Sequence, residues 1–188
     1  MKKVLLLLSD GFEAYEASAF TDVIGFSKNG GIAIDVESVG LHKILSCAFG
    51  FSVIPNKVLQ EITIDNYDAL AIPGGNSKSG FYKDAYEERF LETIRCFHHA
   101  KKPIASICTG GMPVAKAGVL KGRYGTTFSG KRQREMISYN VVVLSQDIVV
   151  DKNVITSSSP KTGVEVAFKL VEMLLPESNF ESIRSFFQ

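Results

Sequence analysis

The sequence predicts an open, mostly parallel α/β sandwich, and three observations support this fold class. First, short apolar runs alternate with helix-like segments along the chain, which is typical of a parallel sheet covered by helices. Second, residues 4–8 are apolar at every position, as expected of a central strand covered on both faces. Third, an apolar run at 103–107 leads into Cys108, with two glycines close behind and then a helix-like segment, which indicates a strand, a sharp turn and a helix.

Length and composition indicate one domain, residues 1–188, which is large enough to bury a core because 45% of its residues are hydrophobic. Lysines and arginines number 21 against 20 aspartates and glutamates, so the net charge of +1 indicates neither a nucleic-acid nor a membrane partner. The three cysteines, at positions 47, 96 and 108, form neither a disulfide framework nor a metal pattern. This usage, and the shortness of the apolar run at 4–8, favour a cytoplasmic location without a signal peptide or a membrane span.

The elements of the first half follow from hydrophobic periodicity and from glycine and proline punctuation. In order, they are a strand at 4–8, a helix at 12–28 ended by Asn29, Gly30 and Gly31, a strand at 32–39, a hairpin or excursion at one sheet edge within 41–64, a core strand at 69–73, a flexible loop at 74–80 and an amphipathic helix at 84–100.

The second half continues the alternation. In order, we expect the strand at 103–107, a helix at 112–117 stopped by Gly118, short strands at 126–128 and 141–144, a hairpin formed by 148–150 and 154–156, and a last long helix at 162–175 with Pro176 behind it. The basic cluster at 131–134 is interpreted as a solvated surface.

The turn at Cys108 has the features of a nucleophile elbow. Such a turn requires small residues two positions before and two positions after the nucleophile, and Ser106 and Gly110 meet this requirement. The unpaired N–H groups of the first helical turn direct positive partial charge at the sulfur, so we expect a lowered thiol pKa and a reactive thiolate. The alternative is that Cys108 is a small hydrophobic core residue, which is the commoner role of a free cysteine.

Two further loops are expected beside this elbow, because ligands of parallel sheets bind beyond the carboxyl ends of the strands. The loop at 9–16 supplies Glu13 and Glu16; acids in a first helical turn can merely complement the helix dipole, and this alternative stays open for Glu13. Burial and a neighbouring thiolate would keep Glu16 protonated, so that it could donate a hydrogen bond to sulfur or move a proton.

The loop at 74–80 begins with Gly74 and Gly75, which are either ordinary turn residues or places of close backbone approach. In the second case, the N–H groups of Gly75 and Thr109 would form an oxyanion hole, or would hold the oxygens of an oxidised cysteine.

The three histidines, at positions 42, 98 and 99, all precede Cys108, and the segment 157–162 contains none. The base that activates the cysteine of a Cys–His hydrolase is therefore missing from the expected place. The pair at 98 and 99 is interpreted as part of a solvated helix end.

Four segments carry a resemblance to a known family: GFEAYE at 11–16, IPGGN at 72–76, ICTG at 107–110 and SSPKT at 158–162. In this order and spacing, they resemble the ThiJ/PfpI family, and within it the branch of the parkinsonism-associated protein deglycase and its bacterial ThiJ-like relatives. The resemblance implies a flavodoxin-like three-layer sandwich, shared with class I glutamine amidotransferases, and a homodimer.

The resemblance also implies roles for individual residues. Cys108 falls on the reactive, oxidation-prone cysteine, Glu16 on its protonated partner, and Gly75 with Thr109 on the amides that face the sulfur; Glu13, Gly74 and Gly110 would support the site. The chain departs from the family at two positions. Peptidases of the family carry histidine where this chain has Thr109, so peptidase activity is not expected, and the deglycase-like branch often has a histidine where this chain has Phe128.

The sequence leaves two functions of different classes open. The first is a glyoxalase or deglycase that acts on 2-oxoaldehydes or their glycated adducts, with Cys108 as nucleophile and Glu16 as acid and base, and with no metal or organic cofactor. The second is a non-enzymatic redox sensor or chaperone that works through oxidation of Cys108. Amide hydrolysis of the amidotransferase type is a weaker third hypothesis, because the downstream histidine is absent.

Overall fold

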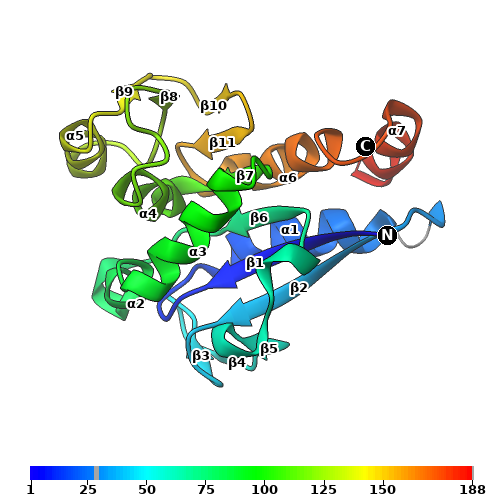
Figure 1. The fold of residues 1–188 in the computed structure, drawn as a ribbon, viewed down its shortest axis with the longest axis horizontal. Coiled ribbons are helices and arrows are strands. Elements are labelled where there is room, and N and C mark those ends of the chain that lie inside the picture. Colours follow the sequence, from blue (N-terminus) through cyan, green and yellow to red (C-terminus); the bar gives the residue numbers. More distant parts are fainter. Residues whose placement is uncertain (28–29, 188) are drawn as a thin grey trace.

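The computed structural model describes residues 1–27 and 30–187, and its centre is a seven-stranded sheet with helices on both faces (Figure 1). The strands of this sheet are β1 (Lys2–Leu8), β2 (Ile34–Gly40), β5 (Lys57–Val58), β6 (Ala69–Ile72), β7 (Ile104–Ser106), β10 (Ile148–Asp151) and β11 (Val154–Ser157). Their order is β10-β11-β7-β6-β1-β2-β5, and all neighbours are parallel except β10 and β11. This is a flavodoxin-like α/β arrangement, which confirms the predicted fold class.

Within the described residues, two small sheets lie outside the central one. An antiparallel hairpin of β3 (Leu45–Ser46) and β4 (Ser52–Val53) forms the excursion expected within 41–64, and β8 (Tyr124–Gly125) pairs in parallel with β9 (Val142–Val143).

The helices form two layers. Helices α1 (Ala14–Ser27), α6 (Gly163–Glu172) and α7 (Glu177–Arg184) pack on one face of the sheet, and α2 (Phe81–Ala85), α3 (Glu88–His99), α4 (Gly111–Lys116) and α5 (Lys131–Ser138) lie on the other (Figure 1). Strand β1 shows why both layers form: Leu6 belongs to the first apolar cluster, whereas its neighbours Leu5 and Leu7 belong to the second. Alternate side chains of a strand point to opposite faces, so an all-apolar strand needs cover on both. None of the helices in the described part of the chain is long and apolar enough to cross a membrane.

The amphipathic helix predicted at 84–100 is confirmed by α3, but the predicted start is wrong, because α2 ends at Ala85 and α3 begins only at Glu88. Glu87 has an extended backbone (φ −65°, ψ 142°), which ends one helix and begins the next. Asp84, expected at a helix start, is buried near the end of α2, where its carboxylate accepts a hydrogen bond from the Asp10 amide at 2.9 Å. This bond ties α2 to the loop that follows β1.

Other boundaries also differ from the prediction. The strand expected at 126–128 lies at Tyr124–Gly125, and α5 and α7 were not predicted at all. The last long helix was expected to reach residue 175, but it ends at Glu172. The first helix begins at Ala14 rather than at residue 12, and its predicted end at residues 28 and 29 lies outside the described residues.

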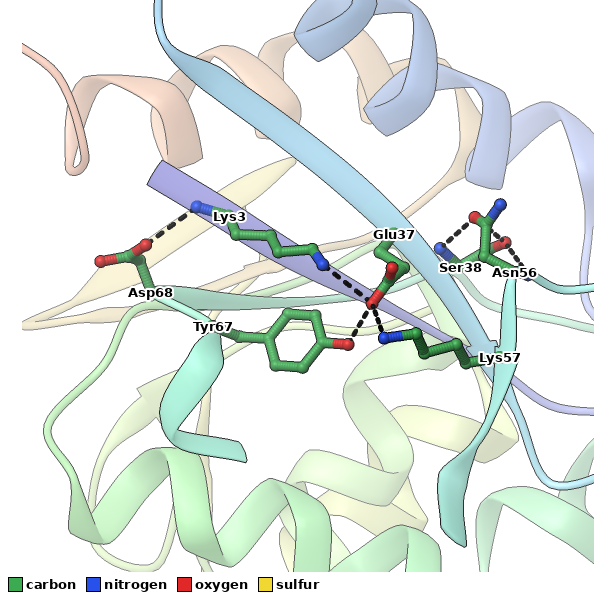
Figure 2. A network of polar contacts seen from close by, with 7 residues as sticks. All are labelled: Lys3, Glu37, Ser38, Asn56, Lys57, Tyr67 and Asp68. Atoms are coloured by element: carbon green, nitrogen blue, oxygen red, sulfur yellow. Dashed lines mark hydrogen bonds and ion pairs between the residues drawn. The ribbon is translucent and has the colours of Figure 1, made fainter. Parts of the chain in front are cut away.

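A polar network joins three strands at the sheet edge (Figure 2). Lys3 of β1 and Lys57 of β5 contact the Glu37 carboxylate of β2 at 3.0 and 3.6 Å, and the Tyr67 hydroxyl donates a hydrogen bond to the same carboxylate. Burial alone would raise the pKa of Glu37, but Tyr67 and the two lysines outweigh burial and lower it. None of these residues lines the cavity described below, so the network serves to fix the edge of the fold.

Candidate active site

Cys108 lies at a strained turn between β7 and α4. Its φ of +54° is in the left-handed region, which is unfavourable for a residue with a side chain and recurs at functional sites. A short 3₁₀ turn, Cys108–Gly110, then leads into α4. A Cβ atom on Gly110 would lie 2.6 Å from the carbonyl oxygen of Ile72, so only glycine lets the turn approach the end of β6 this closely. The strand, turn and helix predicted around Cys108 are therefore confirmed.

Two hydroxyl groups hold the elbow from the side of β8 and β11. The Cys108 amide donates to Ser157 Oγ at 3.4 Å, and Thr127 Oγ1 donates to the Cys108 carbonyl at 2.9 Å. All three residues are buried. Neither contact was predicted from the sequence, because nothing in the local pattern says that these segments end beside the elbow.

Glu16 is completely buried in the first turn of α1. Its Oε2 accepts a hydrogen bond from the Gly74 amide at 2.5 Å, whereas Oε1 is buried without a hydrogen-bond partner among the described residues. Burial, and next the negative charge of Glu13, raise the pKa of Glu16 to about 8, although the Gly74 amide and the nearby Cys108 thiol lower it. The carboxyl therefore keeps its proton at neutral pH, in the direction that the sequence predicts.

The expectation of a lowered thiol pKa is wrong. Burial raises the pKa of Cys108, and the negative charge of an ionised Glu16 raises it further. The Thr109 amide acts in the opposite direction and is outweighed. Burial raises the pKa of both groups, and the charge on one affects the other, so the pair titrates as one coupled unit. Ionisation of both groups would place two negative charges side by side, which is unfavourable.

Gly75 and Thr109 are joined by a reciprocal contact. The Gly75 amide donates to Thr109 Oγ1 at 2.8 Å, and the same hydroxyl donates to the Gly75 carbonyl at 2.9 Å. The Thr109 backbone amide faces the thiol, whereas the Gly75 amide is engaged with the Thr109 side chain. The structure thus brings both residues to the elbow, with one of the two amides already occupied.

The three loops expected to meet do converge. The backbone of Phe12 bridges both Cys47 and Gly75, which brings the loop after β1 against the loop after β6. A Cβ atom on Gly74 would lie 2.6 Å from Thr109 Oγ1 and 2.7 Å from Glu16 Oε2, so the second loop touches the elbow and the buried acid together. Glycine at this position is therefore required by close approach.

A cavity of about 260 Å³ opens beside Cys108. Glu13, Gly75 and Thr109 line it, as do Phe128, Tyr82 and Arg132. A water molecule takes about 30 Å³, so a small organic molecule fits. Glu16 lies behind this wall, because its side chain has no exposed surface.

Two of the lining residues were not expected there. Arg132 belongs to the basic cluster at 131–134 that was interpreted as solvated surface, but it faces the cavity from α5. Tyr82, in α2, was not singled out at all. No sequence signal marks either residue, because their place depends on how α2 and α5 dock.

No histidine lines the cavity among the described residues. His99 is exposed at the end of α3, as expected, whereas His98 is half-buried, so the solvated helix end is confirmed for His99 alone. His42 contacts the Asp84 carboxylate at 3.2 Å. Asp10, His42 and Asp84 bring three possible metal-ligand atoms within 4.8 Å of one another. Hydrogen bonds to backbone amides and between these side chains account for their arrangement, and none of the three lines the cavity.

A cysteine on a strained strand-to-helix turn, beside a buried carboxyl that keeps its proton, defines a class of α/β proteins with a reactive-cysteine elbow. Within this class, the chain belongs to the DJ-1/PfpI family, whose sequence pattern matches residues 2–173.

Similar proteins cover most of the chain. It is 34% identical over 117 residues to Deglycase PfpI of Pyrococcus furiosus, covering 62% of this chain and 68% of that protein. It is 27% identical over 184 residues to Protein dj-1beta of Drosophila melanogaster, covering 97% of this chain and 94% of that protein. The crystal structure of Drosophila melanogaster DJ-1beta superposes with a TM-score of 0.86 at 25% identity and covers 99% of this chain and 97% of its own. Schizosaccharomyces pombe DJ-1 gives a TM-score of 0.84 at 23% identity, with 97% of each chain covered, which shows the shared fold.

Proposed function

We propose that this protein is a cofactor-free enzyme of the glyoxalase or deglycase type, which acts on 2-oxoaldehydes or their adducts with Cys108 as nucleophile and Glu16 as acid and base. Relatives named as deglycases support a deglycase-type function at the level of the family. The observation that carries the proposal is the pairing of a buried, proton-retaining Glu16 with the Cys108 thiol at the wall of a small cavity.

The proposed reaction begins from the form of the pair in which Cys108 has lost its proton and Glu16 has kept its own. The Cys108 sulfur adds to the aldehyde carbon C1 of R–CO–CHO, and Glu16 gives its proton to the resulting alkoxide, which forms a hemithioacetal. The ionised Glu16 then removes the hydrogen from C1 and returns it to C2, while the C1 hydroxyl proton moves to the C2 oxygen. These transfers oxidise C1 and reduce C2 by two electrons each and leave a thioester of a 2-hydroxy acid. Proton transfer by one well-placed carboxyl contributes about 10²- to 10⁴-fold to such a step.

Water completes the cycle. It attacks the thioester carbonyl and gives a proton to Glu16, the C–S bond breaks, and the 2-hydroxy acid leaves with the thiolate and the protonated Glu16 restored. In sum, R–CO–CHO and water become R–CH(OH)–COOH. An adduct of the aldehyde with an amine or thiol enters the same sequence once it releases the 2-oxoaldehyde in the cavity. The Thr109 amide, which faces the sulfur, is the donor best placed for the oxyanions of the addition steps.

The direct test is lactate formation from methylglyoxal. We expect Cys108→Ala to abolish turnover and Glu16→Gln to reduce it by at least about 100-fold, since the amide cannot exchange protons. Cys96→Ala serves as the matched control, because this partly exposed cysteine lies in α3 and does not line the cavity. Undiminished turnover in Cys108→Ala would contradict the proposal.

A redox sensor at the same site is the second candidate, and one observation favours it. The Thr109 amide and the Glu16 proton are hydrogen-bond donors that an oxidised Cys108 sulfur could use. Mild peroxide should then oxidise Cys108 before Cys47 and Cys96, as read by mass spectrometry of the intact protein and its peptides. Equal oxidation of all three would argue against this role.

A homodimer is the proposed assembly. Exposed apolar side chains support it, because Tyr15, Phe51 and Ile54 surround an apolar hollow of about 460 Å³ between α1 and the β3–β4 hairpin. Burial of such a patch between two copies removes apolar surface from water. Light scattering of the purified protein should give twice the chain mass of 20.6 kDa, whereas a single-chain mass would refute it.

A further inference from the structure

The cavity beside Cys108 has a cationic wall that the proposed reaction does not use. Arg132 is the one cationic side chain that lines the cavity among the described residues. It lies in the first turn of α5, whereas Cys108 lies in the 3₁₀ turn that precedes α4, so the docking of α5 beside this turn brings both residues to the same cavity. The acid–base chemistry proposed above needs only Glu16, so Arg132 has no role in that chemistry and could instead bind the substrate.

Contacts on two sides hold the Arg132 guanidinium in place. Its Nη1 donates to Glu135 Oε2 at 2.6 Å, and its Cζ lies 4.0 Å from the centre of the Tyr82 ring. The other oxygen of Glu135 accepts a hydrogen bond from the Tyr86 hydroxyl at 3.0 Å, which anchors α5 beside α2. A guanidinium has five N–H donors in a planar fork, so the single bond to Glu135 leaves donors available at the cavity.

Tyr82 adds a second donor to the same wall. Its hydroxyl is buried and has no hydrogen-bond partner in the described part of the chain. The Thr109 side chain and Cys108 are both near enough to influence this phenol. Because an unpaired buried hydroxyl is unfavourable, a ligand that accepts a hydrogen bond from Tyr82 would be stabilised.

A carboxylate is the group that matches these donors. It is planar, it accepts two parallel hydrogen bonds from a guanidinium, and it is small enough to share a cavity of about 260 Å³ with the reacting carbonyl. Glu13 also lines the cavity, but it comes from a different loop, and the ion pair of Arg132 is made with Glu135. Burial raises the pKa of Glu13, which weakens its repulsion of an anion.

We propose that Arg132 and Tyr82 form a carboxylate-binding subsite, and that the preferred 2-oxoaldehyde or adduct carries a carboxylate group. The substrate class rests on the proposed function, whereas the subsite itself does not. Binding of the carboxylate on this wall would orient the reacting carbonyl relative to the Cys108 sulfur.

Alkylation of Cys108 tests the subsite without any turnover. Iodoacetate and iodoacetamide attach to the same sulfur and release iodide, but only iodoacetate carries a carboxylate. We expect the ratio of their rate constants at Cys108 to exceed that of free cysteine by about 10-fold, the lower end of what a hydrogen bond to a charged group contributes. Arg132→Gln should remove this excess, whereas Arg134→Gln, an exposed arginine of the same helix, should keep it. An unchanged ratio in Arg132→Gln would overturn the subsite.

Salt gives a second readout that needs no variant. If Arg132 attracts the anion, added salt screens the attraction and the iodoacetate to iodoacetamide ratio of the wild type falls. If the acids of the site dominate, screening relieves repulsion and the ratio rises, which would overturn the subsite even if Arg132→Gln did not fold.

Measurements of kcat/KM then test the substrate class independently of the subsite. The probes are 4,5-dioxopentanoate, a 2-oxoaldehyde with a carboxylate, and its methyl ester, which is neutral and nearly equal in size. We expect kcat/KM to favour the acid by at least about 10-fold in the wild type and by much less in Arg132→Gln. Absence of turnover with both probes and with methylglyoxal would refute the proposed function while the alkylation result stands. Turnover with equal kcat/KM for the two probes would refute the proposed substrate class alone.

Discussion

Replacement of Glu16 by glutamine should change how the stability of the protein depends on pH. The pKa of Glu16 is raised from 4.5 to about 8 by burial and by Glu13, so the folded state binds this proton more tightly than the unfolded state does. The stabilising contribution of the protonated carboxyl is therefore complete below pH 4.5 and is lost as the pH rises to about 8. At about 1.36 kcal/mol for each pH unit, the wild type loses about 5 kcal/mol over this interval on account of Glu16.

The assay is urea denaturation at a series of pH values between about 4 and 8.5, which spans the ordinary and the raised pKa of Glu16. The difference in the free energy of unfolding, Glu16→Gln minus wild type, should start near zero at the acid end and grow by several kcal/mol in favour of the variant. Glu181→Gln, at an exposed position of α7, serves as the control and should follow the wild type at every pH. A difference that does not vary with pH would refute the reasoning, because it would mean that Glu16 ionises at its ordinary pKa.

Three other perturbations test the proposed mechanism, the close approach at Gly74 and the network at the sheet edge. The kcat/KM for methylglyoxal should rise with pH through an apparent pKa near 8 as the Glu16 and Cys108 pair loses one proton, and a profile that is flat from about pH 6 to 9 would contradict the mechanism. Gly74→Ala should destabilise the protein by about 1–3 kcal/mol and slow Cys108 alkylation, because the added methyl group collides with Thr109 and Glu16. The control is Gly25→Ala, in open space on α1, which should stabilise the protein by about 1 kcal/mol in the same denaturation assay. Tyr67→Phe should cost about 1 kcal/mol in that assay, since Glu37 loses one hydrogen bond but keeps its lysines.

The sequence predicted every strand of the central sheet except β5, but it did not predict helices α5 and α7. An all-apolar run such as β1 has one common explanation, which is cover on both faces, and both apolar clusters of the fold contain residues of β1. Helix α5 was not predicted because Met136 is its only buried residue, so its hydrophobic periodicity is too weak to recognise. The break between α2 and α3 is equally invisible, since neither proline nor glycine marks Glu87.

Some residues of the candidate site were likewise predicted from the sequence, and others were not. Cys108, Glu16 and Gly74 were found because a tight turn and a close approach demand particular small residues near a reactive group in the sequence itself. Arg132 and Tyr82 were missed because they reach the cavity only through tertiary contacts, among them the bond from Tyr86 to Glu135. The sign of the thiol pKa shift was missed for a related reason: helix geometry is readable from the chain, but the depth of burial that outweighs it is not.

Because burial raises the pKa of the thiol, the reactivity that we propose for Cys108 depends on Glu16 rather than on the helix terminus. The Gly74 amide donates to Oε2, which makes Oε2 the carbonyl-like oxygen and leaves the proton to Oε1. Oε1 has no other partner among the described residues, and the Cys108 thiol is near enough to influence this carboxyl. When the pair loses one proton, a proton kept on Oε1 can stabilise the thiolate by a hydrogen bond that an ionised Glu16 could not supply. In the proposed mechanism, the burial that raises the pKa of the thiol also keeps a proton on Glu16 beside the nucleophile, and the Gly74 contact leaves this proton on Oε1.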